Sequence, residues 1–430
     1  MENYIKEVGL KNYPNTSAKK KITNIFLYLA VLFTVYSIHL KILPNIASPR
    51  IILMLLFSFD FFRKKGFRVE RNLKWVKKRT FTWGYFNLCL LLYSFVIALG
   101  NGALTSEYSA FTAFFNYFIM VFFFSFVLEE YFTDEVQFCN AMIVATLIQS
   151  SIVILSLLPS VRILLENIQY GDIARYSDRV IGIGITGATG SIYLFTGLFA
   201  NAYILLFNKI QWKYILSFIT ILIAIAFVAR TGFYVSIVIL LFIVFFGSGG
   251  INIKIKRNIM FFSLFILLSL GTYIFIKKVE VNLNLIEYTI GRLDEIFKPS
   301  NSKTLKTISN MNIPSLTFET LIGTGVEKGY TSNGELIWHD SGYVQRYMSV
   351  GFVMALLSYL SLTIYINSLI KKVKQSKKRM FFRLLLVLML FIEIKEPFIF
   401  TLAYPFVLLI LLRLTVKSYV SKEKREEISL

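Results

Sequence analysis

The stretch ILIAIAFVARTGFYVSIVILLF (221–242) is apolar throughout, except for one charged residue, Arg230, near its middle. About 20 consecutive apolar residues are needed for a helix to cross a bilayer. The runs 212–229 and 231–247, on the two sides of Arg230, approach that length. We interpret them as two membrane-spanning helices joined by a tight turn at 229–231. The fold of the whole chain follows from this pattern, because such runs recur along nearly all of it.

The composition agrees with a membrane protein. The 430 residues are 56% hydrophobic and 17% charged, with a mean hydropathy of +0.63, whereas soluble domains average about 25% charged residues. The sequence predicts an all-α, polytopic membrane protein of about twelve transmembrane helices, forming a single domain over 1–430. The spans are expected near 22–40, 50–62, 81–99, 111–128, 138–158, 181–207, 212–229, 231–247, 258–276, 343–369, 381–395 and 398–413.

The formal net charge of +21 first suggests nucleic-acid binding, but the distribution of basic residues indicates membrane topology instead. With the N-terminus inside, 31 of the 46 Lys and Arg fall in cytoplasmic segments, notably in 63–79 and 371–383. Basic residues concentrate on the cytoplasmic side of membrane proteins, where they face anionic lipid. We therefore expect both termini to be cytoplasmic, membrane lipid to be a partner, and nucleic acid not to be one.

This topology places the unusual polar features on the external side. They are the stretches 174–190, 229–231 and 393–397, together with a large external loop, 277–342, between spans nine and ten. The loop is long enough to fold over the outer mouth as a lid-like region. Segments far apart in the sequence are thus expected to meet at one membrane surface.

Arginines mark two of these segments. An ionisable residue at membrane depth is energetically costly and indicates a function by default, so Arg230 is a candidate, although an arginine can also snorkel from a hairpin tip. Arg175 and Arg179 precede glycines at 182, 184, 187 and 190, which are expected to interrupt or thin span six. These glycines would let the backbone come close to a ligand. Alternatively, they are small residues that allow neighbouring helices to pack closely. Guanidinium groups bind diphosphate through paired hydrogen bonds.

The stretch WHDSGYVQRYMSVG (338–351) contains one of the two histidines of the chain. A helix that starts at Ser341 or Gly342 would place Tyr343 and Arg346 on one face. His339 is a candidate base or sugar-binding group. Asp340 or Ser341 fits the N-cap position of this helix, and for Asp340 this interpretation has a weight similar to that of a functional carboxylate.

Taken together, RVIG (179–182), ARTG (229–232), GTGVEKGY (323–330), HDSGYVQRYMSVG (339–351) and EIKEP (393–397) resemble, in order, the motifs of O-antigen and capsular polysaccharide polymerases (Wzy type). The resemblance covers roughly the latter two-thirds of the chain. It implies a metal-independent, type C glycosyltransferase-like membrane enzyme of the O-antigen ligase/polymerase superfamily. Ligases usually have asparagine after the histidine, where this chain has Asp340, which favours a polymerase without excluding a ligase.

The resemblance implies transfer of a growing glycan from undecaprenyl diphosphate to an incoming lipid-linked repeat unit at the outer face of the bacterial cytoplasmic membrane. It also implies a chain-length regulator and a flippase as partners, and neither a cofactor nor a metal. Transport of lipid-linked sugars is the alternative function. The expected roles are catalysis by His339 and Asp340, diphosphate binding by Arg175, Arg179, Arg230 and Arg346, and sugar binding by Tyr343, Lys395 and Glu396.

Overall fold

The computed structural model describes residues 16–38, 41, 48–65, 74–101, 108–169, 180–208, 211–247, 255, 258–259, 262–263, 266, 313–327, 329–330, 336–337, 339–401 and 403–429. These residues are mostly helical, as predicted. The first half contains α2 (Thr16–Tyr36), α3 (Pro49–Lys65), α4 (Lys74–Gly100), α5 (Ser109–Tyr117), η3 (Phe118–Phe124), α6 (Ser125–Glu129), α7 (Glu135–Leu155), α8 (Pro159–Ile168), α9 (Gly187–Phe207), α10 (Trp212–Val228) and α11 (Arg230–Phe246). The second half contains α15 (Phe318–Ile322), α16 (Gly342–Val350), α17 (Phe352–Ile370), α18 (Ser376–Glu393), η6 (Ile399–Thr401) and α19 (Ala403–Ser429).

Several of these helices are long and apolar enough to cross a membrane, which indicates a membrane-embedded protein. Within the described residues they are Lys78–Gly100, Ser109–Glu129, Glu135–Leu155, Gly187–Phe207 and Phe352–Ile370. The stretches Ile25–Tyr36, Trp212–Val228 and Arg230–Phe246 are shorter apolar helices. The predicted ninth span, 258–276, lies almost wholly outside the described residues.

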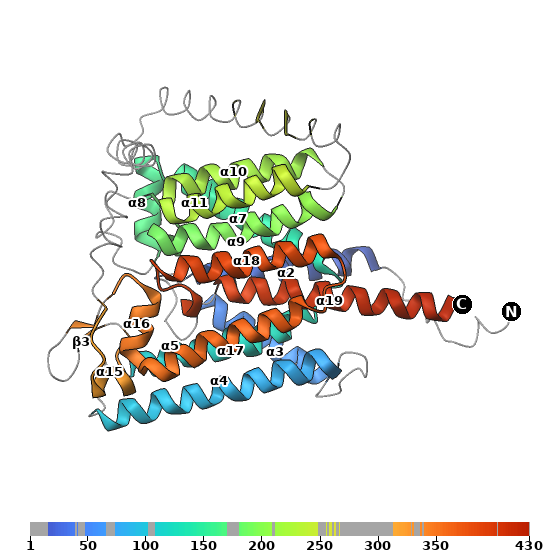
Figure 1. Cartoon of the computed structure of the whole chain (residues 1–430). Coiled ribbons are helices and arrows are strands. Elements are labelled where there is room, and N and C mark those ends of the chain that lie inside the picture. Colours follow the sequence, from blue (N-terminus) through green and yellow to red (C-terminus); the bar gives the residue numbers. More distant parts are fainter. Residues whose placement is uncertain are drawn as a thin grey trace.

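The helices run roughly side by side, and α8 lies across one end of them (Figure 1). That end also carries α15 and α16, and we call it the α16 end. At the opposite end, α17 turns into α18 through a segment rich in exposed lysines, which include Lys371, Lys374 and Lys377. We call this the basic end. The C-terminal part of α19 also extends from the basic end (Figure 1).

The helix α9 forms the centre of one half of the bundle, where it packs against α7, α10 and α11. It starts at Gly187, so the predicted span 181–207 is wrong for its first six residues. These residues form a hairpin of β1 (Ile181–Gly182) and β2 (Ile185–Thr186). The turn requires glycine at 184, which has φ +73° and whose missing Cβ would lie 2.7 Å from the carbonyl oxygen of Tyr36.

The predicted single span 343–369 is also wrong in one respect, because Gly351 divides it into α16 and α17. Gly351 has φ +80°, a conformation that favours glycine, and a Cβ there would collide with the carbonyl oxygen of Leu321. Gly323 lies against Gly351 and has φ +102°. A Cβ added to Gly323 would lie 2.5 Å from the Gly351 nitrogen. The two glycines therefore let α15 pack directly against the break between α16 and α17.

Charged side chains are buried near the basic end, which the sequence did not indicate. Arg413 on α19 is fully buried and forms an ion pair with Glu129, which is 1% exposed, at the end of α6. Arg413 also donates to the Ser125 hydroxyl at 2.6 Å. Lys417 adds ion pairs to Glu129 at 2.8 Å and to Glu130 at 2.5 Å. This cluster joins α19 to the α5–η3–α6 span.

Candidate functional site

The motif GTGVEKGY begins as an irregular strap, residues 323–327, that lies along the last turn of α16. The amides of Thr324 and Gly325 donate to the carbonyl oxygens of Met348 and Ser349 at 3.0 and 2.8 Å. The Gly325 carbonyl oxygen in turn accepts from the amide of Ala110, at the start of α5, at 3.0 Å. The strap thus satisfies backbone groups that would be left unpaired at a helix C-terminus and a helix N-terminus.

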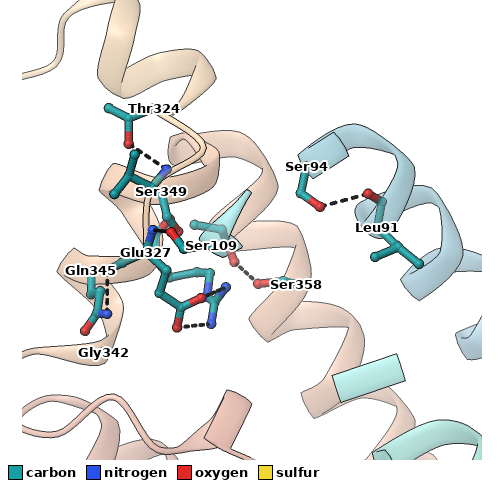
Figure 2. Close-up of polar contacts among 12 residues, drawn as sticks. Leu91, Ser94, Ser109, Thr324, Glu327, Gly342, Gln345, Ser349 and Ser358 are labelled. Carbon is teal, nitrogen blue, oxygen red and sulfur yellow. Dashed lines mark hydrogen bonds and ion pairs between the residues drawn. The ribbon is translucent and has the colours of Figure 1, made fainter. Parts of the chain in front are cut away.

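The strap ends at Glu327, whose carboxylate binds Arg346 of α16. Both terminal nitrogens of Arg346 contact the two carboxylate oxygens at 3.2 Å, and the guanidinium lies over the rings of Phe114 and Phe400, 4.6 and 4.1 Å from their centroids. Figure 2 shows Glu327 beside Ser109, whose hydroxyl accepts from the Glu327 amide at 2.7 Å, and close to Gln345. Arg346 is 4% exposed, so its guanidinium is enclosed by protein and neutralised by a carboxylate, in place of the predicted diphosphate.

The motif EIKEP contributes a second buried carboxylate, Glu393, at the end of α18. It is 1% exposed and accepts hydrogen bonds from the amides of Phe398 and Ile399, at 3.0 and 2.9 Å, and from the Tyr359 hydroxyl at 2.6 Å. A Cβ on Gly342 would collide with this carboxylate. The glycine that follows Ser341 is therefore required for α16 to start beside Glu393.

Glu393 is not among the predicted site residues, although its neighbours Lys395 and Glu396 are predicted to bind sugar. These two side chains are partly exposed and pair with each other at 2.9 Å. The signal that could have singled out Glu393 is a carboxylate that follows a long apolar run, four residues before a proline. An ionisable residue in such a run needs partners inside the protein.

The predicted catalytic pair lies just before α16, which starts at Gly342 as expected. The imidazole Nδ1 of His339 accepts from the amide of Ser341 at 2.9 Å. A neutral imidazole with an acceptor at Nδ1 carries its proton on Nε2, so this arrangement gives His339 a hydrogen-bond donor at Nε2. Asp340 is exposed, and the N-cap position belongs to Ser341, which makes no side-chain cap. Of the two residues predicted for the N-cap position, Ser341 is therefore the one found there, without a side-chain hydrogen bond, and Asp340 is wrong.

Tyr343, the predicted sugar contact, lies half-buried on the first turn of α16. Its hydroxyl donates to the carbonyl oxygen of Leu390 at 2.8 Å, and its ring packs on that of Tyr359 with centroids 4.7 Å apart. It therefore joins α16 to α17 and α18 near Glu393. This position leaves part of the ring accessible at the α16 end.

The predicted arginine of the turn, Arg230, is the first residue of α11. One extended residue, Ala229, connects α10 to α11, which confirms the expected tight turn. The next glycine, Gly232, accepts no side chain because a Cβ would lie 2.7 Å from Ser191, whose hydroxyl accepts from the Gly232 amide at 3.1 Å. Arg230 itself is half-buried. Arg175 and Arg179 lie outside the described residues.

Packed aromatic rings connect the surroundings of Glu393 with α9. The amide of Phe398 donates to Glu393, and the ring of Phe398 packs on that of Tyr404 of α19. The ring of Tyr404 packs on that of Phe195 of α9, and the two pairs of ring centroids are 5.5 and 5.9 Å apart.

In the described part of the chain, no three His, Cys, Asp or Glu side chains are grouped so that they could hold a metal ion. No family model matches this chain, and no curated protein matches it.

Proposed function

We propose that this protein is a glycosyltransferase that polymerises lipid-linked oligosaccharide repeat units. The observation that carries the proposal is the meeting of three motif segments, 323–327, 339–346 and 393–399, at the α16 end. Glu327 binds Arg346, and Glu393 lies against Gly342. Buried ionisable side chains in a membrane protein are candidates for a functional site, and at the α16 end, unlike in the Arg413 cluster, they join the segments that carry the motif resemblance.

In the proposed reaction, the acceptor hydroxyl attacks the glycosyl carbon and the undecaprenyl diphosphate leaves. The leaving group needs cations, and Arg179, Arg230 and Arg175 are the candidates. Asp340 would take the proton of the acceptor hydroxyl, and His339 would donate from Nε2 to a sugar or phosphate oxygen. Tyr343, Lys395 and Glu396 would line the path of the sugar, and Arg346 would position α16 through Glu327. No metal takes part in this scheme.

The proposal includes a topology of about twelve spans in the bacterial cytoplasmic membrane, with both termini cytoplasmic and the α16 end external. The exposed lysines of the basic end support this orientation, because basic residues collect on the cytoplasmic side. A flippase would supply the lipid-linked units to the α16 end, and a chain-length regulator would limit the polymer.

The function is tested by the lipid-linked glycan profile of cells that lack the protein, compared with cells that carry it again on a plasmid. Accumulation of single repeat units on lipid at the external face, reversed by the plasmid, is the expected result. Full-length polymer that persists on its lipid carrier would instead show ligation. Single units trapped at the cytoplasmic face would show transport.

Replacing Arg179 or Arg230 with lysine is expected to lower polymer formation about 10- to 100-fold. Lysine keeps the charge but loses the paired donors, and a hydrogen bond to a charged group is worth about 1.5–3 kcal/mol. The measurement is polymer formed per amount of protein in membranes. The matched control is Arg63→Lys at the basic end, where the arginine is exposed and pairs with Asp60 at 3.1 Å, and no change is expected. Normal polymer formation by both lysine variants would contradict diphosphate binding.

His339 is expected to tolerate glutamine but not alanine. The amide nitrogen of glutamine can occupy the place of Nε2 and donate in its stead, so His339→Gln should keep activity within about tenfold, while His339→Ala should lose a further tenfold or more. If His339 were the base, both variants would lose about 10²–10⁴-fold. The dependence of the rate on pH provides a second readout for each variant. Loss of a catalytic base removes the rise in rate that deprotonation of that base causes, whereas loss of a hydrogen-bond donor leaves this rise in place.

A further inference from the structure

A short segment at the α16 end presents large apolar side chains outward. Ile313, Leu316 and Phe318 are 74%, 67% and 76% exposed, and Leu321 follows at 41%. We call residues 313–322, which include α15, the α15 ledge. Exposed apolar side chains grouped in this way mark a binding surface.

The ledge is firmly held, so the exposure of these side chains is a property of the fold. Thr317 and Thr320 cap α15 reciprocally, each side chain accepting from the other's amide, at 3.2 and 2.8 Å. The hydroxyl of Tyr347 donates to the carbonyl oxygen of Ser315 at 3.3 Å. The close approach of Gly323 to Gly351 described above fixes the end of α15 against the bundle.

The position of the ledge along α4 indicates its depth. The hydroxyl of Tyr93 donates to the carbonyl oxygen of Ile322 at 2.9 Å, and Tyr93 precedes Gly100, the last residue of α4, by seven residues. Seven residues correspond to about 10 Å of helix. Helical side chains lean toward the helix N-terminus, which here is farther from the α16 end. The Ile322 end of the ledge therefore lies beside the last turns of α4, and Figure 1 shows α15 next to the end of α4.

The flanks beside the ledge are those of two helices that are long and apolar enough to span a membrane, α4 and α17. Their exposed side chains near the α16 end are also apolar. They are Leu92, Val96 and Leu99 of α4, at 57%, 62% and 50%, and Phe352, Val353 and Leu356 of α17, at 50%, 49% and 47%. In a membrane-embedded protein such faces contact lipid acyl chains. The apolar side chains of the ledge thus lie next to this surface, while Ser315, Thr317 and Glu319 of the ledge are also exposed and make it amphipathic.

We propose that the α15 ledge is a membrane-binding surface, with Ile313, Leu316 and Phe318 inserted among the acyl chains of the leaflet at the α16 end. The occupant is lipid, because the ledge is near the lipid-facing flank and its large exposed side chains are apolar, while Glu319 can reach the headgroups from an amphipathic segment at the interface. This placement differs from the lid over the outer mouth that the sequence suggested for 277–342. It does not depend on the proposed function.

The test is a nitroxide spin label at position 318, introduced as Phe318→Cys in the full chain with Cys89→Ala and Cys139→Ala, and reconstituted in phosphatidylcholine–phosphatidylglycerol vesicles. Power saturation measures how often the nitroxide collides with oxygen, which concentrates in lipid, and with a water-soluble nickel chelate. The two collision rates are compared. Val96→Cys is the lipid reference, and Lys377→Cys, which is exposed in the basic end, is the water reference. Leu316→Cys repeats the measurement at a second ledge position.

The expected result is an oxygen-to-nickel ratio at 318 and 316 close to that at 96 and at least several-fold above that at 377. A ratio close to the value at 377 would place the ledge in water and overturn the proposal. Low collision with both reagents would show that protein covers the ledge, either another part of this chain or a second copy, and would also overturn it. Equal elution of all variants as folded protein makes the comparison valid.

Discussion

Replacing Asp340 with asparagine is expected to lower the rate of polymer formation about 10²–10⁴-fold, the amount that a positioned base usually contributes. Asparagine has the same shape but cannot accept the proton of the acceptor hydroxyl at neutral pH. Asp340 is exposed and lies outside the cap of α16, so the folded state should not change. The measurement is the polymerisation rate of the purified variant with a lipid-linked repeat unit, beside its thermal stability.

The control for this experiment is Asp134→Asn. Asp134 is a true N-cap, whose carboxylate accepts from the amide of Gln137 at 2.8 Å at the start of α7. Asparagine is an equally good N-cap, so this variant should keep both stability and activity. Near-normal polymerisation by Asp340→Asn would remove Asp340 from the chemistry and would leave the proposed reaction without a base.

Replacing Arg413 with methionine is expected to lower the free energy of unfolding by about 3–5 kcal/mol, the usual cost of leaving one member of a buried ion pair uncompensated. Arg413 is fully buried, and its loss leaves Glu129 with Lys417 as its remaining cation. The expected observation is a large loss of folded protein on heating in detergent. Activity per folded molecule should change little, because the cluster lies far from the α16 end.

Two further variants separate the ion pair from simple packing. Glu129→Gln combined with Arg413→Met removes both charges and should recover much of the lost stability. Lys417→Met should cost less than Arg413→Met, since Lys417 is partly exposed. Burial alone would lower the pKa of Lys417, but Glu129 and Glu130 raise it above the ordinary value, so the lysine stays charged. An Arg413→Met variant as stable as the wild type would show that the pair contributes nothing.

Local sequence signals predicted several elements correctly. The pair Ser341–Gly342 marked the start of α16, and the single arginine in 221–242 marked the turn between α10 and α11. The helical character of the chain followed from its apolar runs. Each of these features depends on residues that are close together in the sequence, so the sequence contains the necessary information.

The features that sequence analysis missed depend on pairs that the fold alone brings together. Glu327 meets Arg346, Glu393 meets Tyr359, and Glu129 meets Arg413 across 284 positions of the chain. Hydrophobic periodicity contains no information on such partners. It also missed the break at Gly351, because a single glycine is compatible with a continuous helix, and the reason for the break is the close approach of the backbone of Leu321 and Ile322.

The lengths of α10 and α11 affect the bilayer around them. Each has 17 residues, and so spans about 25 Å, less than the hydrocarbon thickness of about 30 Å. The span in α4 has 23 residues, or about 35 Å at the same rise. A bilayer accommodates a short helix by thinning beside it. The hydrophobic mismatch is therefore expected to draw lipid headgroups inward beside α10 and α11. Under the proposed function, a lipid-borne diphosphate would then meet Arg230 at a depth that the bilayer beside α4 does not offer.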